Sequence, residues 1–344
     1  VPSSPSAQGR AGPDRLRRMS LATVDIAVLR GSTRGADYAR AADDLHAALS
    51  EIGFAVIVDH GVDRRVIDDM RTAVATVFAT PREILMRDMV RKGNYRGFVP
   101  LGYFTPNSGR GKPDQYEAWK LHHETAADDP IRAACPLYGP NVWPRIDADI
   151  RTPVMTYWRA LTRVSETLII ALCTRLGIDP ARILSCMTNP LTNMTLLNYP
   201  PTPPQDETWG IHPHKDFNLL TLLAHDPIGG LEVRDRAGRW IEAECPPDGM
   251  VLNVGDMLEL WSGGRLVSTP HRVVNRSGSA RQSFPYFSKP RYDVVVEPLL
   301  EPIAGFDRLP LHVGTSAADI WYSNWPDAAS TDPAQELGDY ARDG

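Results

Sequence analysis

The sequence predicts a mainly β protein with flanking helices, in which many short strands form a sandwich, jelly roll or barrel. The main observation is a series of short apolar runs between about Met194 and Tyr292, separated by Gly, Pro, Asn and Asp. This spacing is typical of antiparallel strands in such folds. Three helical patterns precede this series of strands: two with a strand pattern between them, and then one long helical pattern. We therefore expect helices around one β core.

The first part of the chain reads as a small α/β region. Ala22–Val28 is a short strand pattern, and Tyr38–Ile52 has apolar residues at helical spacing that end at Gly53. Phe54–Val58 is an apolar run that suits a buried strand, and a second helix is expected over Arg64–Ala79. This region is predicted to lead into the β core.

A loop-rich segment and a long helix come next. Residues 92–112 are rich in Gly, Tyr, Phe and Asn without a clear period, which favours ordered loops that line a site. Pro153–Leu176 has apolar residues at helical spacing over its whole length, and Gly177 provides a C-terminal stop. We expect one long helix there.

The short runs after this helix share apolar or β-branched residues and flanking turn residues. We predict strands at Met194–Tyr199, Leu219–Ala224, Leu231–Arg234, Trp240–Ala243, Met250–Val254, His271–Val274 and Arg281–Phe287. Beyond Tyr292 the chain is rich in Pro and Asp, with a short helix expected near Ser316–Tyr322. The predicted regions are a disordered leader or cloning remnant (1–18), an N-terminal α/β region (19–150), a supporting helix (151–180), the β core (190–292) and a tail (293–344).

Composition excludes several classes of protein. The 344 residues are 42% hydrophobic and 23% charged, as in a globular protein with a sizeable core. The net charge of −5 gives no general attraction to nucleic acid or to an anionic membrane, so a small molecule is the expected partner. No apolar run approaches the roughly 20 residues of a membrane helix. The four cysteines form no C-x-x-C pair, which favours reduced thiols and a cytoplasmic location over a zinc knuckle or a disulfide framework: Cys135, Cys173, Cys186 and Cys245.

A candidate metal site begins at His214 and Asp216. These residues are two apart, so on a strand both side chains point to the same side and can bind one metal. His271 is the best third ligand, since it starts a β-branched run on a distant predicted strand. Two histidines and one carboxylate on one face leave three positions open, which suits Fe(II) and dioxygen chemistry.

His212 is a competitor for this site. His212 and His214 are also two residues apart, and an H-x-H pair is a common metal signature. We prefer His214 with Asp216, because the H-x-H pair lacks a suitable downstream Glu and leaves Asp216 unexplained. An isolated H-x-D sequence is common by chance, so the residues around it must show whether it binds a metal.

Arg281 and Ser283 provide such context. They alternate on one predicted strand face about ten residues after His271. A guanidinium beside a hydroxyl is suited to bind a carboxylate through paired hydrogen bonds. The alternative is that Arg281 is an ordinary solvent-facing residue.

Taken with these residues, ordered motifs over most of the chain identify a resemblance. The chain resembles the iron- and 2-oxoglutarate-dependent dioxygenases of the isopenicillin N synthase-like group. The matching segments follow the family's order: 53–62 (GFAVIVDHGV), 95–102 (YRGFVPLG), 111–118 (GKPDQYEA), 198–201 (NYPP), 219–223 (LLTLL), 229–233 (GGLEV), 253–256 (NVGD) and 268–274 (STPHRVV).

The resemblance implies a double-stranded β-helix, which is a jelly roll, with iron on the His214, Asp216 and His271 triad. It implies that Arg281 and Ser283 hold the distal carboxylate of 2-oxoglutarate and that Tyr199 donates a hydrogen bond to this co-substrate. Fe(II), 2-oxoglutarate and dioxygen would then oxidise an unactivated C–H bond of a small molecule, such as a secondary metabolite, with hydroxylation as the expected reaction and succinate and CO2 as co-products. Asn253 and Asp256 are interpreted as structural.

Other readings stay open. Some relatives keep the R-x-S pair without using 2-oxoglutarate, so an iron oxidase that desaturates or closes a ring is the first alternative. A divalent-metal hydrolase is the second, and a non-catalytic binding protein the third. Some relatives have a basic residue at the position of Thr195, so the co-substrate contacts can differ here. The oligomeric state is not predicted.

The substrate pocket is predicted from loop and strand aromatics and nearby polar residues. These side chains could equally pack the helices onto the barrel. The aromatic and basic candidates are Tyr95, Arg96, Phe98, Tyr103, Phe104 and Phe287, and the polar ones are Lys120, His122 and His123.

Overall fold

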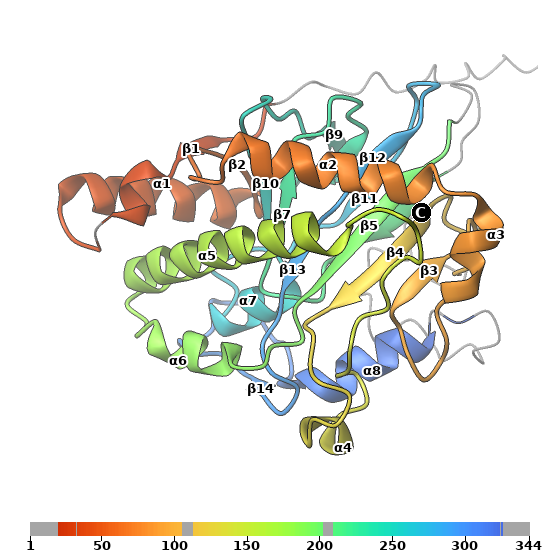
Figure 1. Cartoon of the computed structure of the whole chain (residues 1–344). Coiled ribbons are helices and arrows are strands. Elements are labelled where there is room, and N and C mark those ends of the chain that lie inside the picture. Colours follow the sequence, from red (N-terminus) through yellow and green to blue (C-terminus); the bar gives the residue numbers. More distant parts are fainter. Residues whose placement is uncertain (1–19, 32, 105–112, 202–208, 324, 326–344) are drawn as a thin grey trace, which may run out of the picture.

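The computed structural model describes residues 20–31, 33–104, 113–201, 209–323 and 325 (Figure 1). The predicted leader, residues 111–112 of the matched motifs and the end of the tail lie outside these ranges. The chain folds into two main sheets with helices on the outside of the larger one.

The large sheet has nine strands, one of which, β12, lies off the main path. Their order is β1 (Thr23–Asp25), β2 (Phe54–Val58), β10 (Met250–Val254), β7 (Leu220–Ala224), β13 (Tyr286–Ser288), β5 (Asn193–Tyr199), β4 (Glu117–His122) and β3 (Gly97–Val99), with β12 (Arg281–Ser283) paired to β5. The small sheet has the order β6 (Ile211–His214), β11 (His271–Val273), β8 (Leu231–Arg234) and β9 (Trp240–Glu242). A third pair joins β14 (Val295–Val296) to β15 (Leu311–His312).

Both edges of the large sheet come from the N-terminal part of the chain. β1 and β2 form one edge, and β3 and β4 form the other. The strands between them, β10, β7, β13 and β5, come from the second half of the sequence. The two halves therefore share one sheet.

Helices α2 (Arg64–Phe78) and α5 (Arg151–Leu176) cross the outer face of the large sheet (Figure 1). Tyr157 and Trp158 of α5 pack edge-to-face against Phe284 and Tyr286, at ring-centre distances of 5.2 and 5.7 Å. Gly177 ends α5 in the left-handed conformation, at φ 72°, which favours glycine. None of the described helices is long and apolar enough to cross a membrane.

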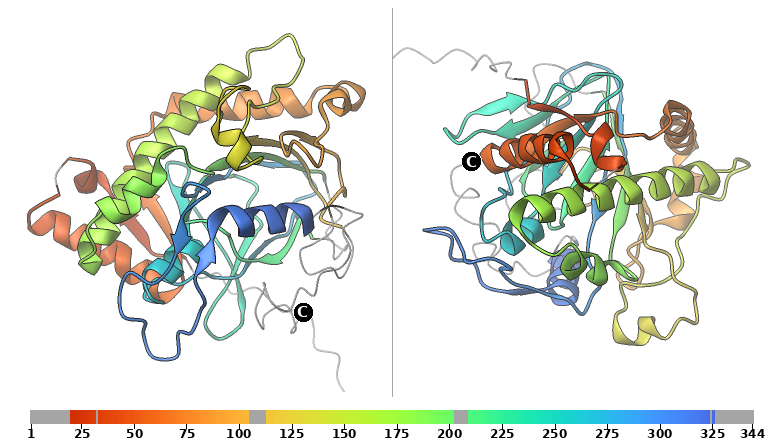
Figure 2. Two further views of the ribbon diagram at one scale, coloured as in Figure 1. Left: turned by 90° about the horizontal axis from the view of Figure 1, so that it is seen from below. Right: turned by 90° about the vertical axis from the view of Figure 1, so that its left-hand side faces the viewer.

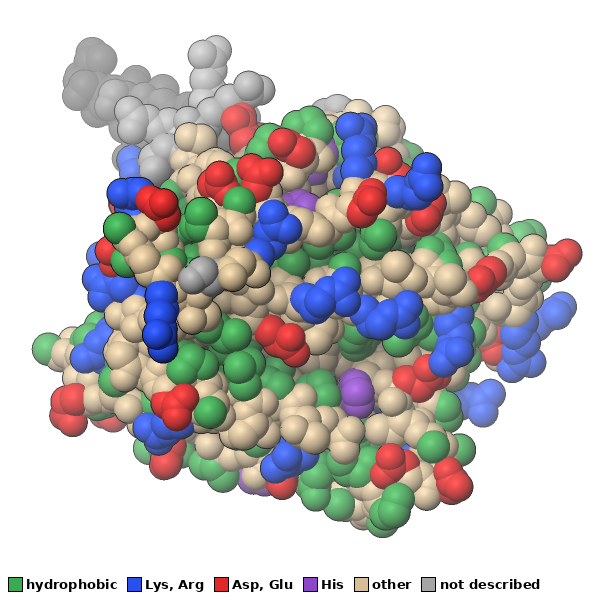
Figure 3. Space-filling view, turned by 60° about the vertical axis from the view of Figure 1, so that its left-hand side comes forward, with side chains coloured by type: hydrophobic (Ala, Val, Ile, Leu, Met, Phe, Trp, Pro, Cys, Tyr) green, Lys and Arg blue, Asp and Glu red, His purple; other side chains and the backbone are tan. Residues whose placement is uncertain are grey.

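Apart from α1 (Ala36–Glu51), which packs against α5 and β2, the other helices are short. α8 lies in front of the strands in the view from below (Figure 2, left). On the face shown in Figure 3, acidic and basic side chains are interspersed. The remaining helical segments are α3 (Arg82–Leu85), α4 (Ile131–Ala134), α6 (Ala181–Leu184), α7 (Asp256–Trp261), α8 (Val313–Ser323), and the 3-10 turns η1 (Ala27–Arg30), η2 (Met86–Asp88) and η3 (Ser185–Met187).

The structure differs from the predicted elements in several places, and β3, β6 and the β14–β15 pair were not among the predicted strands. The predicted strand over Arg281–Phe287 divides into β12 and β13, because Pro285 between them has no N–H to donate and its carbonyl accepts from Thr195. β4 was not predicted, although Trp119, Lys120, Leu121 and His122 alternate between apolar and polar residues. Asp256, expected in a turn after the strand Met250–Val254, begins helix α7.

Candidate metal centre and co-substrate site

The three predicted metal ligands come together at one end of the small sheet. His214 ends β6, His271 begins β11, and the two residues are paired directly across these strands. Asp216 follows β6 and places Oδ1 at 3.7 Å from Nε2 of His214 and 3.6 Å from Nε2 of His271. One ligand atom of each residue lies within 4.8 Å of the others, and no other such group occurs among the described residues.

Both imidazoles present the same nitrogen to this centre. Nδ1 of His214 lies 2.8 Å from the carbonyl of His212, and Nδ1 of His271 lies 3.1 Å from the carbonyl of Thr269. A carbonyl only accepts, so each Nδ1 donates and each Nε2 keeps its lone pair. Burial lowers the pKa of His271 to about 4, so this imidazole is neutral at pH 7. The two Nε2 atoms can therefore bind a cation.

The carboxylate of Asp216 is oriented by two strands of the large sheet. Its Oδ2 accepts hydrogen bonds from Thr221 Oγ1 at 2.5 Å and from Asn253 Nδ2 at 2.8 Å. Burial would raise the pKa of Asp216, but the two imidazoles and these hydrogen bonds lower it below its usual value. With Oδ2 occupied, the anionic Oδ1 faces the histidines, as a metal ligand would.

His212 does not join this group. Its Nδ1 lies 2.5 Å from Oδ1 of Asp114, and its backbone N–H donates to the same oxygen at 2.9 Å. Asp114 therefore holds His212 away from the triad, while the carbonyl of His212 orients His214. The geometry favours the H-x-D set over the H-x-H pair.

Replacing Asn253 by alanine should weaken metal binding by about 10- to 100-fold, because Oδ2 of Asp216 loses one of its two donors. The dissociation constant for Fe(II) under argon measures this effect. Asn198→Ala is the matched control, since Asn198 bonds to Glu117 and not to Asp216. Equal metal affinity in the two variants would contradict the positioning role of Asn253.

The predicted anion site is also assembled. Arg281 and Tyr199 are directly opposite in β12 and β5, so both point to the same side, and the guanidinium carbon lies 4.9 Å from the ring centre. Nη1 of Arg281 is 3.5 Å from Oγ of Ser283. Nε donates to the carbonyl of Gly229 at 2.7 Å and lies 2.7 Å from the carboxylate of Asp226. Arg281 is 1% exposed, so this orientation is set by the protein.

The anion site and the triad lie between the same two sheets, at different positions along the strands. A Cβ on Gly210 would lie 2.8 Å from the ring of Tyr199 and 3.1 Å from Val273, so the sheets approach closely there. Val273 is two residues beyond His271 on β11, which is about 7 Å along a strand. This separation suits a five-carbon dicarboxylate with one end at the triad and the other at Arg281.

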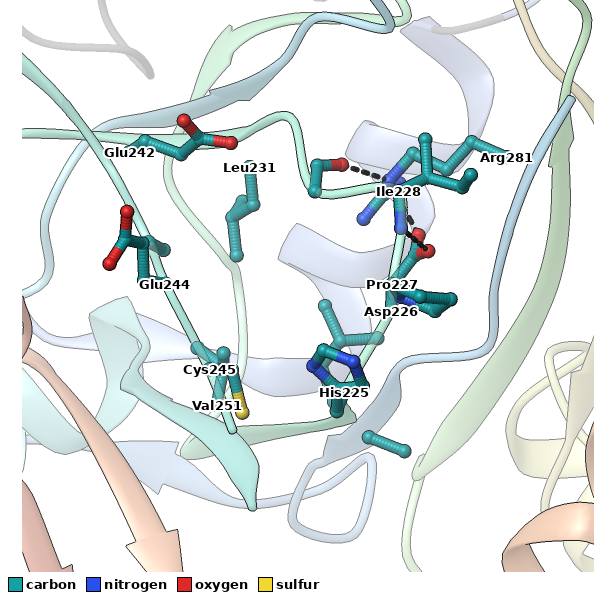
Figure 4. A pocket seen from close by; sticks show the side chains of 14 residues that line it. His225, Asp226, Pro227, Ile228, Leu231, Glu242, Glu244, Cys245, Val251 and Arg281 are labelled. Atoms are coloured by element: carbon teal, nitrogen blue, oxygen red, sulfur yellow. Dashed lines mark hydrogen bonds and ion pairs between the residues drawn. The ribbon is translucent and has the colours of Figure 1, made fainter. Parts of the chain in front are cut away.

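Arg281 also borders a pocket of about 330 Å³ (Figure 4). Asp226, Glu242 and Glu244 line this pocket, and none of the triad residues does. These carboxylates would repel a dicarboxylate, so the pocket is not the co-substrate site.

Comparisons with known proteins agree with this geometry. Residues 191–290 match the model of the 2OG-Fe(II) oxygenase superfamily, and residues 21–146 match that of the non-haem dioxygenase in morphine synthesis N-terminal region. A homoarginine-6-hydroxylase of Oryza sativa subsp. japonica is 32% identical over 260 residues, which cover 73% of this chain and 78% of the relative. The chain belongs to the 2OG-Fe(II) oxygenase superfamily.

Solved structures show the same fold. A putative 2OG-Fe(II) oxygenase family protein from Caulobacter crescentus has 28% identity and a TM-score of 0.74, and the match covers 87% of this chain and 97% of the other. A Neurospora crassa protein in complex with 2-oxoglutarate and thymine has 20% identity and a TM-score of 0.75, with coverage of 90% and 98%. The oxygenase thus has a jelly-roll core and uses iron, 2-oxoglutarate and dioxygen.

In this oxygenase, one substrate candidate, Phe287, lies on the same sheet face as Thr221, and two others, Tyr95 and Phe104, pack against each other. Phe287 of β13 lies directly opposite Thr221, the donor to Asp216, so both point into the barrel. Tyr95 and Phe104 pack together at a ring-centre distance of 5.5 Å, and Tyr95 lies 6.0 Å from the ring of His122.

Two candidates lie elsewhere. Phe98 is paired with Trp119, on the face of the large sheet opposite to Lys120, and is fully buried in the core. Arg96 is 2% exposed and donates to the carbonyl of Leu137 at 2.7 Å. The structure therefore does not bring Phe98 and Arg96 to the metal centre.

Sequence reasoning missed the roles of Thr221 and Asn253. The sequence did contain a signal for Asn253, because it is the one polar residue in the apolar strand Met250–Val254, and a buried polar side chain needs a hydrogen-bond partner. Sequence reasoning also missed Asp114, whose carboxylate pairs with the imidazole of His212 although the two residues are 98 positions apart in the sequence.

Proposed function

We propose that this oxygenase hydroxylates an unactivated C–H bond of a small molecule, with iron on His214, Asp216 and His271 and 2-oxoglutarate on Arg281, Ser283 and Tyr199. The observation that carries the proposal is the triad itself: two Nε2 atoms and one carboxylate oxygen converge, while the other polar atoms of these side chains have partners. Three positions of a six-coordinate metal would stay open.

The bound cofactors would convert the C–H bond and dioxygen to an alcohol, with 2-oxoglutarate becoming succinate and CO2. The protein's part is to hold and orient. Arg281 would fix the distal carboxylate by charge-assisted hydrogen bonds, and Tyr199 and Ser283 would add hydroxyl donors. Asp216, His271 and Arg281 are all buried, which limits the access of water to the reacting atoms. The likeness to homoarginine-6-hydroxylases supports hydroxylation over hydrolysis.

Anaerobic titration tests this function. Fe(II) and 2-oxoglutarate together, and neither alone, should produce the weak visible charge-transfer band of the chelate, and admission of air should yield succinate. The zinc-loaded protein is the control and should give neither signal. Iron binding without the band would indicate a 2-oxoglutarate-independent oxidase, and succinate formed without iron would contradict the proposal.

A further inference from the structure

We propose that the substrate carries an oxyanion, a carboxylate or a phosphate ester, on a largely apolar body, and that Lys120 and Lys289 bind this group. The inference rests on the proposed function, because it concerns the substrate of the same site. Four observations carry it: the position of the two lysines, the absence of an ion-pair partner for either of them among the described residues, the indole N–H groups near Lys120 that have no partner in the same part of the chain, and the distance of Lys120 from Arg281.

Both lysines point into the barrel near the metal centre. Lys120 and His122 are two residues apart on β4, and His122 and Phe287 are both paired with Asn193. Facing residues in a sheet share a side, so these side chains lie on the same side as Thr221. Lys289 follows β13 two residues after Phe287 and lies close enough to Lys120 and His122 to lower the pKa of each.

Neither amine has an ion-pair partner within the described ranges. Nζ of Lys120 is 3.4 Å from Oγ1 of Thr195 and 5.5 Å from the ring centre of Tyr95. The nearby carboxylates are engaged elsewhere, Asp114 with His212 and Asp216 with the triad.

The two charges persist at neutral pH. Burial and the neighbouring Lys289 lower the pKa of Lys120 to about 8, and burial lowers that of Lys289 to about 8 as well. Two partly buried cations that lie close together repel each other, and a bound anion would offset that cost.

Donors without partners lie beside Lys120. The indole Nε1 atoms of Trp321 and Trp325 are buried and have no hydrogen-bond partner in the part of the chain that the structure describes. Trp321 packs 4.2 Å from the ring centre of Tyr95, which also contacts Lys120. An indole N–H can only donate, so an oxyanion is the group it matches. The aromatic rings around it would contact an apolar body.

The same lysines cannot serve the distal carboxylate of 2-oxoglutarate at Arg281. Lys120 is paired with Thr195, whereas Arg281 is paired with Tyr199, four residues further along β5. Four residues of a strand span about 13 Å. Lys120 and Arg281 therefore define two separate anion sites.

The test uses the enzyme loaded with Fe(II) and 2-oxoglutarate under argon, with phenylacetate, phenyl phosphate and the neutral phenylacetamide as probes. Binding is followed by tryptophan fluorescence and by the shift of the visible chelate band. At least one anionic probe should bind about 10-fold or more tightly than the amide. Lys120→Met and Lys289→Met should each weaken its binding by about 10- to 100-fold, while Lys120→Arg and Lys289→Arg retain it. Comparison of the two anions identifies the oxyanion class.

Methionine matches lysine in length and removes a partly buried charge, so these variants should fold. Equal binding of the amide and the anions, or no anion binding with a Kd below about 1 mM, would overturn the inference. A loss of 2-oxoglutarate affinity in the methionine variants would also overturn it, by assigning the lysines to the co-substrate. Failure of the chelate band in the unmodified protein would instead reject the proposed function.

Discussion

Replacing His271 by alanine is expected to abolish iron binding and succinate formation. His271 contributes one of the two Nε2 atoms, and its neutral imidazole is fixed by the carbonyl of Thr269. Loss of residues that merely orient metal ligands costs about 10- to 100-fold in affinity or activity, so loss of a ligand should cost more than about 100-fold. Iron content after dialysis and the rate of succinate formation measure the effect.

His212→Ala is the control for this prediction. It removes the competing histidine, whose side chain pairs with Asp114, and should leave the iron content close to one per chain. If His212→Ala lost the metal and His271→Ala kept it, the H-x-H pair would be the metal site.

Replacing Arg281 by methionine is expected to raise the dissociation constant of 2-oxoglutarate by at least about 100-fold. Two charge-assisted hydrogen bonds to a carboxylate contribute about 3 kcal/mol or more, which corresponds to that factor. Iron binding should be unchanged, because Arg281 does not contact the triad in the structure. Titration of the visible chelate band at fixed Fe(II) gives the affinity for 2-oxoglutarate, and the iron content after dialysis gives the metal binding.

Arg281→Met also leaves Asp226 without its cation, which lowers the free energy of unfolding. Arg281→Lys retains a charge beside Asp226 but lacks the planar fork, so it isolates the loss of paired hydrogen bonds. Gln282→Met, on the other face of β12, is the matched control and should bind 2-oxoglutarate normally. Unchanged co-substrate affinity in both Arg281 variants would contradict the assignment.

Local patterns explain what could be predicted from the sequence. The strands Leu231–Arg234 and Met250–Val254 were predicted with the bounds they have in the structure, because their apolar residues and flanking turns are local. The triad was also predictable, since two ligands lie two residues apart and the third begins a strand.

What could not be predicted depends on pairing between distant segments. The inward face of β4 carries Lys120 and His122, and the sequence alone does not show that these polar side chains face the barrel, because this depends on pairing with β5. The hydrogen bond from Asn253 to Asp216 requires β10 to lie beside β7, because this pairing brings the Asn253 amide to the carboxylate. The pair of Asp114 and His212 likewise joins segments 98 residues apart.

The shared sheet also determines when this protein can fold as it is made. β2 is an apolar strand made early, but its inner neighbour β10 ends only at Val254. β4 likewise waits for β5. A ribosome must therefore synthesise most of the chain before either early strand is covered, and these segments stay available to chaperones or to aggregation in the meantime. Cutting the gene between the two halves would separate strands of one sheet and leave two insoluble fragments.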